Sequence, residues 1–123
     1  MSVEQLKDKV ALVTGGTRGI GAAIAKELYD LHATVIITGT KADYIPLEGY
    51  QYMCTDFSNK NNLNKFVNKI RDKKIDILIN NAGINKIGPI SDLSISEFES
   101  VQQVNVTAPF MLCQVVLVGM RER

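Results

Sequence analysis

The glycine-rich segment from Thr14 to Gly21, with the sequence TGGTRGIG, constrains this chain more than any other feature. It follows an apolar run from Val10 to Val13 and opens a segment with helical spacing. Glycines at a turn between a strand and a helix let the backbone bend tightly and come close to a ligand. Free N–H groups and the positive end of the helix dipole then face an anion. A bare turn would need neither three glycines nor Arg18, so the segment predicts a pyrophosphate site for a dinucleotide.

Two other phosphate-binding motifs do not match this spacing. A P-loop would place Lys and then Ser or Thr after the last glycine, but Gly21 is followed by Ala22 and Ala23. The common dinucleotide fingerprint G-x-G-x-x-G also differs, because the glycines here stand at positions 15, 19 and 21.

Apolar runs and helical periods alternate along the rest of the chain. The pattern predicts strands at about 9–14, 34–38, 50–54 and 75–80, and helices at about 19–31 and 59–73, with a third from a capping box at Ser94 and Glu97. Residues 39–49 contain Pro46 and Gly49 and have no helical period. This alternation predicts an α/β fold with a parallel sheet and right-handed crossovers.

Composition indicates one soluble domain over residues 1–123. The chain is 46% apolar and 22% charged with a net charge of +1, which gives no sign of a nucleic-acid partner, and its start lacks the apolar core of a signal peptide. Cys54 and Cys113 are interpreted as reduced core residues of a cytoplasmic protein. The most apolar stretch, Val104 to Met120, contains several polar residues and is interpreted as a buried helix rather than a membrane span.

Four segments together resemble the short-chain dehydrogenase/reductase family, particularly members similar to 3-oxoacyl-acyl-carrier-protein reductases. They are the T-G-x-x-x-G-I-G turn, Asp56 after the third strand, the segment from Asn80 to Gly83 with sequence NNAG, and Asn105 within VNVT. They occur in family order and cover nearly the whole chain. The resemblance implies the first half of a Rossmann-type sheet, with strand order 3-2-1-4 and flanking helices. Relatives usually place a helix over 39–49, so one outer layer of this sheet is expected to be thin or bare.

The second predicted strand leads into the residues that select the cofactor. An NAD site carries an acidic residue there, but this chain reads Thr38, Gly39, Thr40, Lys41 and has no acid before Asp43. A 2′-phosphate would suit Thr40, Lys41 and also Arg18, the cation directly before Gly19. NADP is therefore favoured over NAD. The alternative is that Lys41 is only a solvated loop lysine. The glycine turn supplies the remaining cofactor-binding residues on this side: Gly15, Thr17, Arg18, Gly19, Ile20 and Gly21.

The resemblance also assigns roles beyond the first helix. Asp56 would accept a hydrogen bond from the adenine amino group, beside Phe57, although a helix cap is an alternative role for this carboxylate. The cofactor riboses would lie beside Asn81, Ala82 and Gly83. Asn80 is expected instead to fix the turn by bonding to backbone.

Asn105 is the candidate catalytic residue. A polar amide among apolar neighbours needs hydrogen-bond partners, because an unpaired buried amide costs about 1–3 kcal/mol. In the family, the matching asparagine orders a water in a proton relay to the catalytic lysine. The alternative is that the amide only satisfies local backbone near Pro109. No metal site is expected.

The family's Tyr-x-x-x-Lys pair is absent from this sequence. The four tyrosines are followed four residues later by Ala33, Glu48, Cys54 and Asp56, and the lone His32 lies at a helix end. The chain is therefore expected to be the cofactor-binding half of such an enzyme, truncated before the catalytic serine and tyrosine and inactive alone. In full-length form it would act on a small carbonyl or alcohol and form a homo-oligomer. The rival interpretations are a non-catalytic dinucleotide-binding module and an interaction protein with a vestigial site.

Overall fold

A computed structural model of the chain describes residues 4–123 and contains a four-stranded parallel sheet in the order β3-β2-β1-β4. The strands are β1 Val10–Val13, β2 Thr34–Gly39, β3 Tyr50–Cys54 and β4 Ile77–Ile79. β1 pairs with β2 and with β4, so that Val13 lies opposite Ile37 on one side and Ile79 on the other. The predicted Rossmann-type sheet and its strand order are confirmed. All four strands point the same way, and their carboxyl ends therefore meet at one edge.

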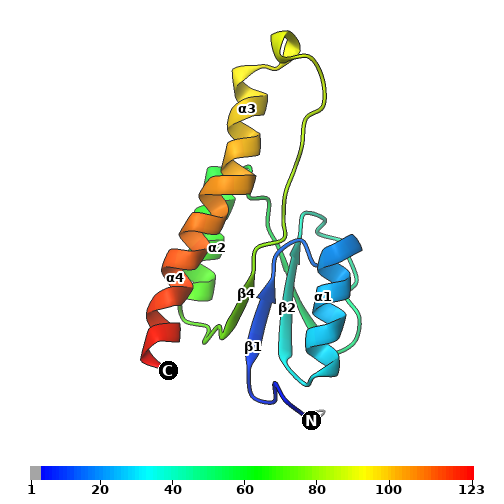
Figure 1. Cartoon of the computed structure of the whole chain (residues 1–123), viewed down its shortest axis with the longest axis vertical. Helices are drawn as coiled ribbons and strands as arrows, with labels where there is room; N and C mark the ends of the chain where they lie inside the picture. Colours follow the sequence, from blue (N-terminus) through cyan, green and yellow to red (C-terminus); the bar gives the residue numbers. More distant parts are fainter. Residues whose placement is uncertain (1–3) are drawn as a thin grey trace.

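Helices cover the two faces of the sheet unequally. They are α1 Gly19–Asp30, α2 Lys60–Arg71, α3 Ile95–Gln102 and α4 Ala108–Glu122, with a 3-10 turn at Ile90–Asp92 and a π-helical turn at Gln103–Thr107. α1 lies on one face, α2 and α4 lie on the other, and α3 continues the line of α4 beyond the sheet (Figure 1). Sequence periodicity placed these helices correctly but missed the π-helical turn.

The larger core lies between the sheet and the α2–α4 layer. Asn59 precedes α2, and its side chain accepts a hydrogen bond from the Asn62 backbone amide at 3.0 Å and so caps the helix. The helix then buries Leu63, Phe66, Val67 and Ile70, which form one apolar stripe at helical spacing. Full burial stabilises each by about 1.5–3 kcal/mol relative to an exposed side chain.

Tyrosines replace a helix on part of the opposite face. Residues 40–49 form no helix or strand, as predicted, and the sheet there is covered by α1 and by aromatic rings. Tyr29 packs edge-on against Tyr50 with ring centroids 5.3 Å apart, and Tyr44 packs against Tyr52 at 4.9 Å. The thin layer expected from the sequence therefore consists of a loop and two ring pairs.

The prediction of a buried C-terminal helix was only half right. Ala108, Leu112 and Val116 on α4, with Val104 one turn earlier, pack in the core, but the other faces of the helix are open and Phe110 is 63% exposed. A spacing of four residues gives one apolar stripe, and α2 and the sheet cover only that stripe. By length and composition alone, the continuous helix from 95 to 122 also suits a membrane span, a test that core helices pass as well.

The two cysteines are not core residues. Cys54 and Cys113 are both free and exposed in the structure. Cys54 ends β3, which is an edge strand, and Cys113 lies next to buried Leu112 but faces away from the stripe. His32 is exposed at the end of α1, as predicted, where it adopts a left-handed backbone conformation with φ of 71°.

Candidate dinucleotide site

Hydrogen bonds from threonine side chains hold three strand ends together at the carboxyl edge of the sheet. The Thr14 hydroxyl oxygen accepts hydrogen bonds from the backbone amides of Asn81 and Ala82, both at 3.0 Å. The Thr38 hydroxyl oxygen accepts one from the Gly15 amide at 3.1 Å. These contacts join the ends of β1, β2 and β4, so the loops after the three strands form one rigid surface.

The glycine turn is packed closely enough to require glycine at two positions. Gly15 has a φ of +64°, a conformation that favours glycine. A Cβ on Gly21 would lie 2.3 Å from the Gly15 carbonyl oxygen and 2.4 Å from the side-chain nitrogen of Asn81. α1 therefore starts directly behind the turn, and the side chain of its N-cap residue, Arg18, makes no capping hydrogen bond. The first amides of α1 and the helix dipole are available to an anion.

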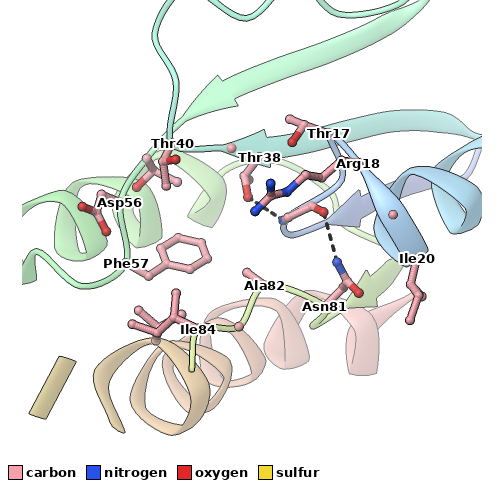
Figure 2. A pocket seen from close by; sticks show the side chains of 16 residues that line it. Thr17, Arg18, Ile20, Thr38, Thr40, Asp56, Phe57, Asn81, Ala82 and Ile84 are labelled. Carbon is pink, nitrogen blue, oxygen red and sulfur yellow. Dashed lines mark hydrogen bonds between the residues drawn. The ribbon is translucent and has the colours of Figure 1, made fainter. Parts of the chain in front are cut away.

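A cavity of about 470 Å³ opens above this turn. Figure 2 shows Thr17, Arg18 and Thr40 on one side of it, Asn81 and Ala82 on the opposite side, and Phe57 at one end. Eleven of the thirteen predicted cofactor residues line the cavity: Gly15, Thr17, Arg18, Gly19, Ile20, Thr40, Asp56, Phe57, Asn81, Ala82 and Gly83. Of the other two, Gly21 lies behind Gly15, and Lys41 lies in an adjoining cavity.

The adjoining cavity has a volume of about 290 Å³ and is basic. Thr17, Arg18 and Thr40 line both cavities, whereas Lys41 lines only the smaller one, together with Tyr44 and Tyr52. None of the ion pairs formed among residues 4–123 involves either cation. No carboxylate lines this space, so it offers two uncompensated positive charges to an anionic group.

Asp56 and Phe57 form the end of the cavity beyond β3. One carboxylate oxygen of Asp56 accepts hydrogen bonds from the amide and the hydroxyl of Ser58, at 3.0 and 2.7 Å. Asp56 thus forms a local turn before α2 and is not the cap of that helix. Phe57 is 5% exposed and packs against Phe66 with ring centroids 5.4 Å apart. Its ring is therefore fixed where it borders the cavity.

The turn-fixing role expected of Asn80 falls to Asn81, which also lines the cavity. Asn81, not Asn80, fixes the turn: its side-chain amide donates to the backbone oxygens of Thr14 and Gly15, at 3.1 and 3.0 Å. The Asn80 amide instead donates to the Cys113 sulfur at 3.5 Å. Successive side chains of an extended segment point to opposite sides. The register of β4 against β1 therefore directs the Asn81 side chain toward the glycine turn and the Asn80 side chain away from it.

Asn105 is exposed, contrary to the expected burial, yet its amide is paired. Its side-chain oxygen accepts from the Ile84 amide at 2.9 Å, and its nitrogen donates to the Ile84 carbonyl at 2.8 Å. Its partner is therefore a distant loop and not the local backbone near Pro109. Asn105 lies in the π-helical turn Gln103–Thr107, an interruption of a kind often found at functional sites.

Sequence reasoning assigned no cofactor-binding role to five residues that line the cavity, Thr38, Gly39, Thr55, Ile84 and Val104, nor to Thr14 at its base. Thr14 and Thr38 supply the hydrogen bonds that shape the site. Both stand in segments that the sequence singles out, but their positions in the sequence do not show these contacts. Ile84 lines the cavity, and Thr55 lines it with a buried hydroxyl that has no hydrogen-bond partner among the described residues. An unpartnered hydroxyl at the wall suits a polar ligand. Across residues 4–123, no group of three acidic, histidine or cysteine side chains could hold a metal ion.

Comparisons with known proteins agree with this geometry. A 3-oxoacyl-(acyl-carrier-protein) reductase, FabG, of Aquifex aeolicus is 36% identical over 127 residues, covering 89% of this chain and 49% of the relative. The crystal structure of a metagenomic short-chain oxidoreductase in complex with NADP superposes with a TM-score of 0.85 at 30% identity, covering 94% of this chain and 57% of that one. A short chain dehydrogenase of Leptospira borgpetersenii with bound NAD+ has a TM-score of 0.81 at 27% identity, covering 98% and 49%.

The extent of these matches decides the family. The chain spans about half the length of the curated relatives it matches. The sequence pattern of the short chain dehydrogenase family matches residues 9–123, nearly the whole of this chain. The chain therefore belongs to the short chain dehydrogenase family.

Proposed function

We propose that this chain is the NADP(H)-binding portion of an oxidoreductase that transfers hydride between nicotinamide and a carbonyl or alcohol. The observation that carries the proposal is the 470 Å³ cavity at the carboxyl edge of the sheet, with the Gly15–Gly21 contact at its base. That contact leaves no room for a Cβ, so a ligand can approach the backbone closely. The family and the NADP held by a similar structure support the same cofactor.

Each part of the cofactor has matching groups in the cavity. The first amides of α1 would hold the pyrophosphate, and Asp56 would accept from the adenine amino group beside Phe57. Asn81, Ala82 and Gly83 would border the riboses. When bound, NADP(H) supplies the hydride carrier of the reaction.

The 2′-phosphate would lie between Arg18, Thr40 and Lys41. Two cations in charge-assisted contacts favour a phosphate there by about 1–3 kcal/mol, or roughly tenfold to a hundredfold in affinity. The contacts are exposed, so added salt should weaken the preference.

Asn105 would serve the chemistry from the π-helical turn. Its two hydrogen bonds hold the backbone of Ile84, next to the segment that borders the riboses. An asparagine amide has two N–H donors and two acceptor sites, so one of each remains for water. A water held there suits the proton relay that the resemblance implies. Because no tyrosine of this sequence precedes a lysine by four residues, we expect no carbonyl turnover from the chain alone.

Assembly and location form part of the proposal. β4 is an edge strand that pairs only with β1 among the described residues, and Val106, Phe110, Leu117 and Val118 are exposed apolar residues along the C-terminal helix. Open strand edges and apolar faces recruit partners, which supports a homo-oligomer, and sedimentation can measure it. Free exposed thiols suit a reducing compartment such as the cytoplasm.

Titration of NADPH and NADH against the chain and a Lys41→Glu variant tests the cofactor proposal. We expect the unmodified chain to favour NADPH, and Lys41→Glu to abolish most of that preference. Lys74→Glu makes the same charge change in the exposed segment before β4, at the opposite edge of the sheet, and should preserve the preference. Equal affinity of the unmodified chain for the two cofactors would refute the proposal.

A further inference from the structure

Tyr52 holds the loop that carries Lys41. Its hydroxyl donates a hydrogen bond of 2.6 Å to the Lys41 carbonyl oxygen, and its ring packs on Tyr44. The same carbonyl accepts a longer bond of 3.4 Å from the Tyr44 amide. Tyr52 is on β3 and Lys41 follows β2, so this contact ties the loop to a strand of the sheet.

The end of β2 leaves the Tyr52 phenol little freedom. A Cβ on Gly39 would lie 2.9 Å from the Tyr52 oxygen and 2.7 Å from the Thr17 methyl. The phenol and the Thr17 methyl therefore both occupy the space that a Cβ on residue 39 would need, and glycine permits both contacts. Residues 40–49 lack regular structure, so the Lys41 backbone is restrained by contacts such as the bond from Tyr52, which is the shorter of the two to the Lys41 carbonyl oxygen.

Tyr52 also remains a hydrogen-bond donor at neutral pH. Burial raises the pKa of its hydroxyl, with a further contribution from Cys54, while the bond to Lys41 acts in the opposite direction. Arg18 and Lys41 are the charged groups lining the same small cavity, and no acidic side chain lines it.

We propose that Tyr52 is a positioning residue for selectivity toward a 2′-phosphate, an inference that rests on NADP as the proposed cofactor. A lysine on an unrestrained loop loses backbone and side-chain freedom when it binds a phosphate. Tyr52 removes the backbone part of that loss before the ligand arrives. Its hydroxyl therefore favours ligands that carry the 2′-phosphate and has no effect on those that lack it.

The test compares two ligand pairs that differ in this phosphate, NADPH with NADH and 2′,5′-ADP with 5′-AMP. Tyr52→Phe removes the hydroxyl and keeps the ring. We expect it to weaken the binding of NADPH and of 2′,5′-ADP by about twofold to tenfold, the range of one net hydrogen bond. The affinities for NADH and 5′-AMP should not change. Tyr50→Phe makes the same change two residues away on β3 and should alter neither pair.

Two further measurements separate positioning from a general structural role. Tyr52→Phe should accelerate hydrogen exchange at the Tyr44 amide, whose acceptor is the released carbonyl. When Lys41 is already replaced by alanine, Tyr52→Phe should cause no further loss of preference for the 2′-phosphate, because Tyr52 acts only by positioning the Lys41 side chain.

The outcomes distinguish this inference from the cofactor proposal. If the unmodified chain shows no preference for the 2′-phosphate, the cofactor proposal fails and this inference fails with it. If the preference exists and survives Tyr52→Phe, only the role of Tyr52 is overturned. An equal weakening of all four ligands would also overturn it, because that result indicates general damage to the site.

Discussion

Replacing Thr14 by valine should destabilise the chain without creating a cavity. Thr14 is 2% exposed, and its oxygen is the acceptor for the backbone amides of Asn81 and Ala82. Valine has nearly the same shape but no acceptor, so the Ala82 amide loses its partner, while the Asn81 amide keeps only its second acceptor, the Ile79 carbonyl oxygen at 3.1 Å. The Thr14 hydroxyl also donates a weak hydrogen bond to the Ile79 carbonyl oxygen. Loss of this bond should cost little stability, because that carbonyl also accepts from the Thr14 backbone amide at 3.1 Å.

The magnitude follows from one amide left without an acceptor, that of Ala82, and one net hydrogen bond lost by the Asn81 amide. Each buried donor left unpaired costs about 1–3 kcal/mol, and partial access of water to the turn favours the lower half of that range. With about 0.5–1.5 kcal/mol for the net hydrogen bond of Asn81, Thr14→Val should lower the free energy of unfolding by about 1.5–3.5 kcal/mol, a large share of the 5–15 kcal/mol typical of a folded domain. Thr14→Ser keeps the acceptor and loses one methyl group, which costs about 0.5–1.5 kcal/mol.

Urea unfolding followed by circular dichroism measures the difference between the two variants. The comparison requires equal m-values, so that the midpoints report stability. Hydrogen exchange gives a local check, because the amides of Asn81 and Ala82 should exchange faster in Thr14→Val than in Thr14→Ser. If the valine variant is as stable as the serine variant, or if those two amides stay protected, then the Thr14 hydroxyl does not hold the strand ends together.

Two other changes probe the turn and the base of the sheet. Gly21→Ala places a Cβ 2.3 Å from the Gly15 oxygen, so we expect a loss of about 1–3 kcal/mol in unfolding free energy and a weakening of NADPH binding. Ala22→Gly, which weakens the helix by about 1 kcal/mol, should keep the affinity; equal binding by both variants would contradict the close-packing argument. The hydrogen bond from the Val10 amide, and then Arg123, lower the pKa of Asp76 in the folded chain. The stabilisation that ionised Asp76 provides is therefore present above the ordinary carboxylate pKa of about 3.9, and it is lost as the pH falls through the lower pKa of the folded state. Asp76→Asn should make the free energy of unfolding depend less on pH below about pH 5. An unchanged pH dependence in this variant would show that the Asp76 carboxylate does not cause it.

Local patterns were enough to predict the sheet and the helices. β2 has a continuous β-branched run, and α2 has an apolar stripe at helical spacing, so strand and helix follow from periodicity. The glycine turn carried its own signal, because only a close backbone approach explains glycine at both Gly15 and Gly21. These features depend on neighbours in the sequence, which a reader of the sequence can see.

Features set by contacts between distant segments were not predictable in the same way. Asn80 and Asn81 are chemically identical, and only the register of β4 against β1 decides which amide reaches the glycine turn. Burial of α4 likewise depends on how much of its surface α2 and the sheet cover. The outward placement of Cys113 and Phe110 follows from that coverage and not from their apolar character.

The smaller cavity shows why a site in this fold extends beyond its motif residues. Arg18 and Lys41 are recognisable from the sequence, since each stands at a position where a cation suits a phosphate. Tyr52 is not, because it lies on a separate strand and acts through the Lys41 backbone. A loop without a helix needs such a tie, and in this chain an aromatic side chain from β3 provides it. Cofactor selectivity in this chain should therefore depend on a residue that has no charge and is not required to touch the phosphate.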